Sequence, residues 1–351
     1  MIKTFYILNS FFLPTGYNHM FMVQKIGRGF EYEGFNLKVV SSVKQITDPG
    51  FVMISDHPFY YSFGSRNNSK GGIQRIVPSI IQKTKILDWI ANFFCKVELS
   101  RLVKHIAGKN IVVIAWNTKY SNILDSLDTP IIYAVEHFYK PDIKNLDKYQ
   151  LFQYKIASTK KNVIPLKFAA DVNPAKIGHN STNKKYILAY VGDKGYIKRY
   201  LHLFKVAANG DWVLKPDGMN EIGICKIVPT PPYITQEEKL RIYSESMMVL
   251  GIHSDRNRAA RMVGERVFEA MAYGAVCLTD NPAAVEMTNN SAVLFNNEKE
   301  FLNLIQKFKN DQKAREEIRN KGFKCIKEDG TWASRARDFI RMANDLYSIN
   351  F

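Results

Sequence analysis

Short apolar runs recur along the first half of the chain, each followed by a polar or glycine-containing turn and a longer amphipathic segment. This alternation is typical of a parallel sheet whose strands are connected by helices. The apolar runs predict strands at residues 4–8, 37–40, 51–55, 111–116 and 131–135. A helix is expected over residues 18–33, because Gly34 then supplies a C-cap directly before the next run.

The pattern lapses over residues 163–184, where two prolines, a glycine and a polar cluster predict a linker. A second series follows and predicts strands at residues 186–191, 247–252, 275–278 and 292–295, then helices at residues 264–273, 298–309, 312–328 and 331–347. A chain of 351 residues also exceeds the size at which a single core usually stops growing.

We therefore expect an α/β protein with two Rossmann-like domains. The first would cover residues 1–165 and the second residues 185–330, with a linker at residues 166–184. Residues 331–351 would form a C-terminal helix that packs back toward the first domain. Because ligands bind at the carboxyl ends of parallel strands, two such sheets predict a cleft enzyme or a binding protein.

The charge is strongly basic: 49 Lys and Arg against 33 Asp and Glu give a net charge of +16. A surplus of this size attracts polyanions, namely nucleic acid, an anionic membrane surface or phosphorylated ligands. A basic amphipathic segment at residues 79–105 suits either a helix packed on the sheet or a helix lying on an anionic bilayer.

The four cysteines form no CxxC pair, which favours a reducing compartment over a disulfide framework or a zinc site. The apolar N-terminal stretch is interrupted by Asn9 and Ser10, so we interpret it as a strand rather than a signal peptide. No apolar run approaches the length of a membrane span. We expect a cytoplasmic protein, with any membrane contact peripheral and on the inner face.

Several strong motifs are absent, including the phosphate loop GxxxxGK[ST], HExxH and GxSxG. The chain also lacks Asp-x-Asp, the carboxylate pair that would hold a diphosphate through a divalent metal. We therefore expect no metal site and no cofactor. A phosphate would instead be held by backbone amides at helix N-termini and by Lys or Arg.

The segment at residues 264–280 carries the most chemistry. Gly264 opens a helix in which Glu265 and Glu269 lie four residues apart on one face, and Arg266 lies in the first turn. A cation there opposes the helix dipole unless an anion binds nearby. This arrangement indicates a bound phosphate.

The same segment resembles the nucleotide-sugar motif of GT-B glycosyltransferases of the "group 1" type, in the branch with R-x-F-E-A-x-A-x-G. The resemblance covers residues 186–346, while the first half matches in architecture only. It implies that Glu269 binds the ribose hydroxyls of the donor. It also implies that the helix N-terminus and nearby basic residues bind the diphosphate, near Gly192 after the first strand of the second domain.

The donor-binding residues implied in this way are Glu269, Arg266, Glu265, Gly264, Gly192, Lys198, Arg199 and Arg261. Arg261 stands where many retaining members carry a second Glu, so the resemblance leaves the stereochemistry open. Together with Arg256 and Arg258, Arg261 suits either stabilisation of a departing nucleoside diphosphate or a solvated basic loop.

Candidates for a catalytic base follow the predicted strands of the first domain. Asp56 and His57 come after residues 51–55, Glu136 and His137 come after residues 131–135, and His19 follows the first loop. Their places at strand ends direct them toward the predicted cleft. Each could equally be a turn or capping residue.

These features predict a hexosyltransferase-like enzyme that moves a sugar from a nucleoside-diphosphate sugar to an acceptor hydroxyl without a metal. The charge suggests an acceptor that is anionic or displayed at a membrane, such as a lipid-linked saccharide of a bacterial cell-surface polysaccharide or lipopolysaccharide. One alternative is a phage-type enzyme that glycosylates DNA, with nucleic acid as the acceptor. Another is a non-catalytic GT-B-like protein that binds a nucleotide sugar or a polysaccharide.

Overall fold

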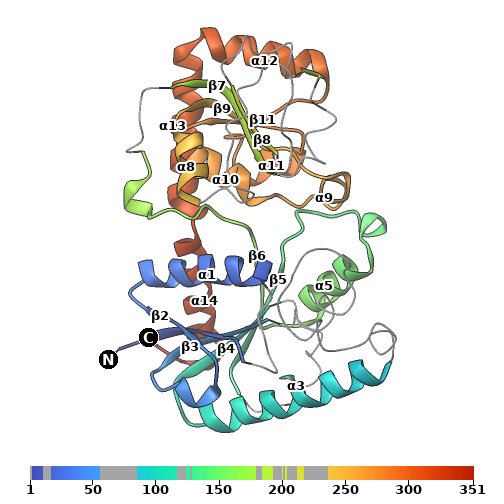
Figure 1. The fold of residues 1–351 in the computed structure, drawn as a ribbon, viewed down its shortest axis with the longest axis vertical. Helices are drawn as coiled ribbons and strands as arrows, with labels where there is room; N and C mark the ends of the chain where they lie inside the picture. The colour runs from blue at the N-terminus through green and yellow to red at the C-terminus, as the bar shows by residue number, and fades with distance from the viewer. Residues whose placement is uncertain are drawn as a thin grey trace. The chain divides into compact units, whose positions relative to one another are not determined.

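The computed structural model describes residues 2–10, 17–55, 85–116, 124–126, 129–178, 184–192, 200, 202–203, 212–216 and 236–351. The chain divides into two compact units (Figure 1). The first unit comprises Met1–Glu136, Phe152–Leu166 and Arg335–Phe351, and the second comprises His137–Leu151 and Lys167–Ser334. The sequence had assigned residues 137–151 to the first domain, whereas they cluster with the second unit.

The first unit is built on a six-stranded parallel sheet of order β2-β1-β3-β4-β5-β6. The strands are β1 (Thr4–Leu8), β2 (Asn36–Val40), β3 (Gly50–Ser55), β4 (Ile111–Trp116), β5 (Ile131–Glu136) and β6 (Val163–Leu166). The first five were predicted. The sixth strand was not predicted, because the strand pattern lapses from residue 163 and Pro165 suggested a turn. Pro165 is tolerated because β6 is an edge strand.

Most or all residues of four helices belong to this unit: α1 (Tyr17–Tyr32), α3 (Lys85–Ile106), α5 (Lys148–Thr159) and α14 (Trp332–Tyr347). Within the first unit, the C-terminal residues pack on the sheet. The ring of Phe339 lies 6.1 Å from that of Phe30, and the ring of Phe351 lies 4.7 Å from that of Phe51. The Tyr347 hydroxyl bonds both the backbone N–H and the carbonyl of Ile131, at 3.2 and 2.5 Å.

The second unit contains a five-stranded parallel sheet of order β11-β10-β9-β7-β8. Its strands are β7 (Tyr186–Gly192), β8 (Trp212–Pro216), β9 (Ser246–Leu250), β10 (Val276–Thr279) and β11 (Val293–Leu294). The sequence pattern predicted all of them except β8. The observed sheets confirm the predicted α/β fold with two Rossmann-like units.

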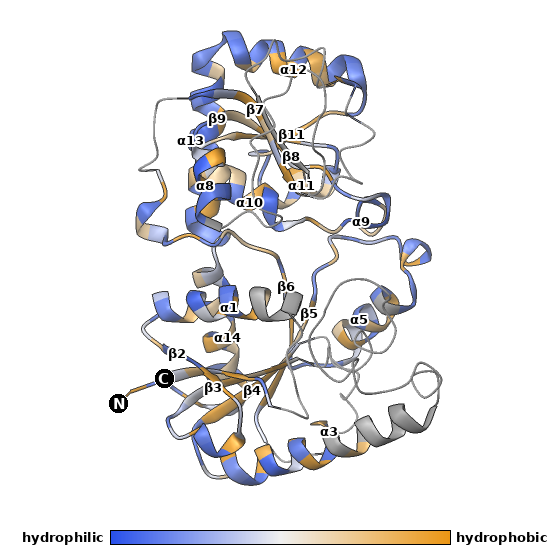
Figure 2. Ribbon diagram, viewed as in Figure 1, coloured by the Kyte–Doolittle hydropathy of each residue, from blue (hydrophilic) through white to orange (hydrophobic). Residues whose placement is uncertain are grey.

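The helices of the second unit are α8 (Gln236–Ser244), α9 (Asp255–Ala259), α10 (Glu265–Ala272), α11 (Pro282–Met287), α12 (Glu298–Asn310) and α13 (Gln312–Asp329). Figure 2 shows hydrophobic residues along the strands and a mixture of hydrophobic and hydrophilic residues on α12 and α13. Apolar side chains of α10 are buried against the sheet. Among the described helices, none is long and apolar enough to cross a membrane.

Every strand of the second sheet runs in the same direction. The carboxyl ends of its strands therefore lie along one edge, and the amino ends lie along the opposite edge. The carboxyl edge collects Gly192, Gly251 and Thr279, at or just after the ends of β7, β9 and β10. The amino edge collects the residues at which these strands begin. Each edge carries its own cavity.

Candidate functional site

A cavity of about 210 Å³ lies at the carboxyl edge of the second sheet, against the first turns of α10. The polar and charged side chains that line it include Lys239, Tyr243, His253, Glu265, Arg266 and Glu269. The cavity therefore contains the residues that the motif at 264–280 singled out, and all of its lining belongs to one compact unit.

Arg266 joins the ends of two strands. Its Nε donates to the carbonyl of Val191 at the end of β7 (2.7 Å), and its Nη1 donates to the carbonyl of Ile252 after β9 (3.1 Å). The guanidinium also lies 4.7 Å from the ring centroid of Tyr190, a cation–π geometry. These contacts compensate a cation in the first turn of α10, where the helix dipole opposes it.

Gly192 leaves room for this guanidinium. A Cβ at residue 192 would lie 1.9 Å from Nη2 of Arg266 and 3.0 Å from the Tyr190 hydroxyl. Such a contact would displace Arg266 from the strand ends. Glycine is therefore required at residue 192 because the Arg266 guanidinium lies so close to the backbone. This role differs from the direct donor contact that the resemblance implied.

Glu269 is buried, with 1% of its side chain exposed, and it is paired with Lys239 from α8. The Lys239 Nζ lies 2.8 Å from Oε1 and 2.7 Å from Oε2 of Glu269. Lys239 is itself only 13% exposed. A buried pair of this kind is stable only because both charges are present, since either one alone would be left uncompensated.

His253 and Asp280 support the N-terminus of α10. The backbone N–H of Gly264, the N-cap residue, donates to Nε2 of His253 at 2.9 Å. Because Nε2 accepts this bond, a neutral His253 carries its proton on Nδ1, which lies 3.5 Å from Oδ1 of Asp280. Oδ1 also accepts the backbone N–H of His253 (3.1 Å), so the carboxylate fixes the chain at this residue.

Glu265 and Tyr243 also line the cavity. Oε1 of Glu265 accepts the indole N–H of Trp332 at 3.4 Å. Tyr243 is fully buried beside Arg266 and Glu269, and burial raises the pKa of its hydroxyl far above the ordinary value. Tyr243 is therefore neutral and available as a hydrogen-bond donor.

Arg261, which the resemblance assigned to the donor, is not among the residues that line this cavity. Its Nε donates to the carbonyl of Tyr139 (2.8 Å), and its Nη2 bonds Glu286. Its backbone has a φ of 56°, in the left-handed region. Arg256 pairs with Asp147 at 2.8 Å, and both side chains are exposed. Arg258 pairs with Asp255 at 2.6 Å and lies 4.0 Å from Asp280.

The predicted catalytic candidates are only partly described. Asp56 and His57 lie outside the described residues, as do the predicted phosphate ligands Lys198 and Arg199. Glu136 is the last residue of β5 and is half-buried, which matches the strand-end position that the sequence indicated. The His137 ring lies 6.4 Å from the ring of Tyr139.

Sequence reasoning missed Lys239, His253 and Asp280. A signal for Lys239 was present, because it lies four residues before Tyr243 and hence on the same face of α8. His253 and Asp280 each follow a predicted strand by one or two residues, the position at which site residues of parallel sheets occur. Within the described ranges, no three His, Cys, Asp or Glu side chains gather as a metal site would require.

Part of the chain is similar to a known protein family. Residues 203–341 match the model of a family described as glycosyl transferase-like. A comparison with curated proteins gives no match.

Solved structures of the same fold cover nearly the whole chain. A sucrose-phosphate synthase from Thermosynechococcus elongatus is 12% identical with a TM-score of 0.56, over 99% of each chain. A trehalose-6-phosphate synthase is 8% identical with a TM-score of 0.57, over 97% of this chain and 98% of that one. The β-glucosyltransferase of T4 phage, in complex with UDP and Mn²⁺, is 14% identical with a TM-score of 0.50, over 99% and 100%.

The two parallel sheets and these likenesses define the fold as GT-B. The family match covers α10 and most of the cavity lining, so this part of the chain is similar to glycosyltransferases.

Replacing Lys239 by Met should lower the free energy of unfolding by about 3 kcal/mol, because the Glu269 carboxylate is then buried without its partner. The double variant Lys239→Met/Glu269→Met should recover most of this loss, since an apolar pair fills the same space. Urea denaturation measures both effects. Lys185→Met is the matched control: Lys185 pairs with Glu245 at 2.8 Å but is 53% exposed, so it should cost less than about 1 kcal/mol. Equal losses in the two single variants would contradict a buried pair.

Proposed function

We propose that this protein is a glycosyltransferase that takes its sugar from a nucleoside-diphosphate donor, and that the cavity at the carboxyl edge of the second sheet holds the nucleotide. The observation that carries this proposal is the buried Glu269 facing a cavity beside the N-terminus of α10. The T4 phage enzyme of the same fold is known in complex with UDP, which supports a nucleotide ligand.

Glu269 suits the ribose because a carboxylate accepts hydrogen bonds and offers about four lone-pair sites. Such a group can accept hydrogen bonds from the hydroxyls of a ribose as well as from Lys239, which contacts both of its oxygens. Lys239 also keeps Glu269 ionised and fixed in position, so the contact is formed without reorganisation.

The diphosphate would lie at the N-terminus of α10. Backbone amides and the helix dipole favour negative charge there. Arg266 retains donors on Nη1 and Nη2 beyond its two bonds to carbonyls, and its position in the first turn puts a positive charge beside these amides. When the sugar leaves, the charge that develops on the departing nucleoside diphosphate meets groups already in place.

The base that accepts the proton of the acceptor hydroxyl would come from Asp56, His57, Glu136 or His137. A carboxylate or a neutral imidazole can take this proton as the new glycosidic bond forms. Glu136 ends a strand of the first sheet, which is the position that the fold uses for ligands.

Removing the charge of Glu269 should weaken nucleotide binding. We expect Glu269→Gln to cost about 1.5 to 3 kcal/mol of binding free energy for the preferred nucleoside diphosphate, because hydrogen bonds to the carboxylate are lost or weakened. Calorimetric titration of UDP, GDP, ADP and TDP measures this. Glu245→Gln is the control, since Glu245 is ion-paired but lies outside the cavity. Unchanged affinity for every nucleotide in Glu269→Gln would refute this donor site.

For the acceptor, we propose a saccharide of a bacterial cell-surface polysaccharide or lipopolysaccharide, carried on a lipid at the inner face of the membrane. The net charge of +16 supports an acceptor that is anionic or displayed on an anionic surface. We further propose that transfer needs no metal, because Arg266 and the amides of α10 can balance the diphosphate charge.

Transfer of labelled sugar to acceptor in EDTA tests both proposals. We expect label on a lipid-linked saccharide and no dependence on added Mn²⁺. Label on DNA instead would identify a DNA-modifying enzyme. Loss of transfer in EDTA with recovery in Mn²⁺ would show that the diphosphate is held through a metal.

A further inference from the structure

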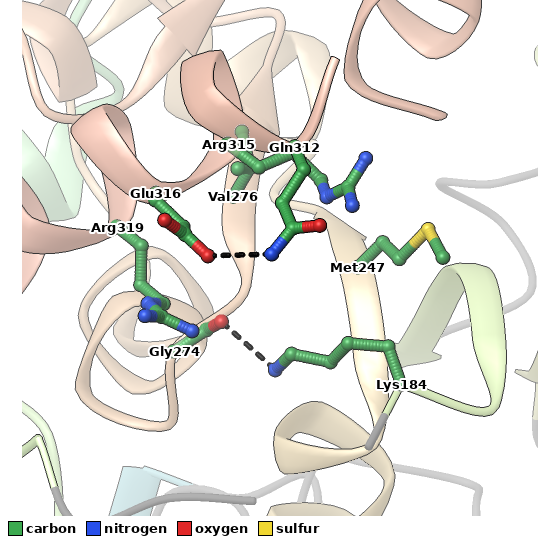
Figure 3. A pocket seen from close by; sticks show the side chains of 8 residues that line it. All are labelled: Lys184, Met247, Gly274, Val276, Gln312, Arg315, Glu316 and Arg319. Atoms are coloured by element: carbon green, nitrogen blue, oxygen red, sulfur yellow. Dashed lines mark hydrogen bonds between the residues drawn. The ribbon is translucent and has the colours of Figure 1, made fainter. Parts of the chain in front are cut away.

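A second cavity, of about 250 Å³, lies at the amino edge of the second sheet. Lys184 precedes β7, Met247 lies near the start of β9, and Val276 begins β10, while α13 supplies the facing wall (Figure 3). This cavity shares no lining residue with the proposed donor cavity, which lies at the opposite edge. It therefore has no role in the function proposed above.

Three cationic side chains line it: Lys184, Arg315 and Arg319. Lys184 donates from Nζ to the carbonyls of Ser244 (2.7 Å) and Gly274 (2.9 Å), at or just after the ends of α8 and α10. Arg315 donates from Nη1 to the carbonyls of Phe308 and Lys309, in the last turn of α12. Helix C-termini carry partial negative charge, which holds these two cations in place.

Arg319 has no such anchor. Its guanidinium lies 5.9 Å from the ring centroid of Phe323, and within the described part of the chain its buried Nε has no hydrogen-bond partner. The lining contains one carboxylate, Glu316, whose Oε1 accepts a bond from Gln312 at 2.8 Å. Three cations thus face one anion in a cavity formed by described residues.

The cations repel one another. Burial, together with the charges of Arg319 and Arg315, lowers the pKa of Lys184 to about 8. Repulsion among three cations destabilises the second unit unless a bound anion balances their charge. It also supplies donors from several directions, as a tetrahedral anion with several acceptor oxygens requires.

We propose that this cavity binds a phosphate dianion, either as inorganic phosphate or as the phosphate group of a small monoester. The guanidinium of Arg319 would be its principal ligand, with Arg315 and Lys184 contributing charge and further donors. A monocarboxylate fits less well, because it balances only one of the three positive charges.

Calorimetric titration of the full-length protein at pH 8 with inorganic phosphate and with glycerol 2-phosphate tests this site. We expect saturable binding that Arg319→Gln weakens at least about tenfold, the loss of one charge-assisted hydrogen bond. Tighter binding of glycerol 2-phosphate would assign the site to monoesters, and tighter binding of phosphate would assign it to the free ion. Lys324→Gln is the matched control, because it removes a positive charge from the same helix at an exposed position.

The donor cavity provides the internal comparison. Arg319→Gln should leave UDP binding unchanged, and Glu269→Gln should leave phosphate binding unchanged, so failure of one site is distinguishable from failure of the other. The proposal is overturned if neither probe binds, if Arg319→Gln binds both as the wild type does, or if UDP displaces the phosphate.

A measurement on the wild-type protein covers the case in which Arg319→Gln does not fold. Bound phosphate should protect Lys184 from acetylation by acetic anhydride at pH 8, because it raises the pKa of the amine. Lys185, exposed and paired with Glu245, is the internal reference in the same peptide map. Equal labelling of Lys184 with and without phosphate would contradict the site.

Discussion

The guanidinium of Arg266 holds the carboxyl edge of the second sheet together. It binds the carbonyls of Val191 and Ile252, so the ends of β7 and β9 and the first turn of α10 are fixed to one planar group. Burial opposes its charge, but Tyr190, Tyr243 and Glu269 around it keep the pKa of Arg266 raised. These contacts also require a glycine at residue 192, because any side chain there would collide with the guanidinium. The ends of β7 and β9 and the first turn of α10 all meet at Arg266, and the cavity is formed where they meet.

Charge is distributed differently at the two edges of this sheet. At the carboxyl edge, the buried carboxylates have partners: Glu269 is paired with Lys239, and Asp280 accepts the backbone N–H of His253. Such a site is organised before a ligand arrives, which suits the binding of a donor and the stabilisation of its leaving group. At the amino edge, cations outnumber carboxylates, and Arg319 lies without a hydrogen-bond partner for its Nε among the described residues. There a ligand would supply the missing charge.

Much of this architecture could be predicted from the sequence. Buried parallel strands such as β4 and β7 are continuous apolar runs, and the helix at Glu265–Ala272 is marked by Gly264 before it and Gly274 after it. Strand β6 was missed because Pro165 is usually a turn signal, and its tolerance depends on an edge position that only the fold reveals. Glu269 and Arg266 were predicted through their motif, and both line the cavity. Lys239 was not predicted, since its pairing with Glu269 across two helices depends on tertiary packing. Arg261 was predicted from its nearness in sequence to the motif, which does not determine the direction of a side chain, and its guanidinium bonds Tyr139 and Glu286.

The central claim is that the cavity beside Arg266 binds the donor nucleotide. Hydrogen–deuterium exchange with and without the preferred nucleoside diphosphate tests it most directly, because amide protection reports the place of binding. The account predicts slower exchange in the first turn of α10, residues 265–268, and at the ends of β7 and β9, with α13 unchanged. Protection confined to α13 and the amino edge of the sheet, with α10 exchanging as in the free protein, would contradict it.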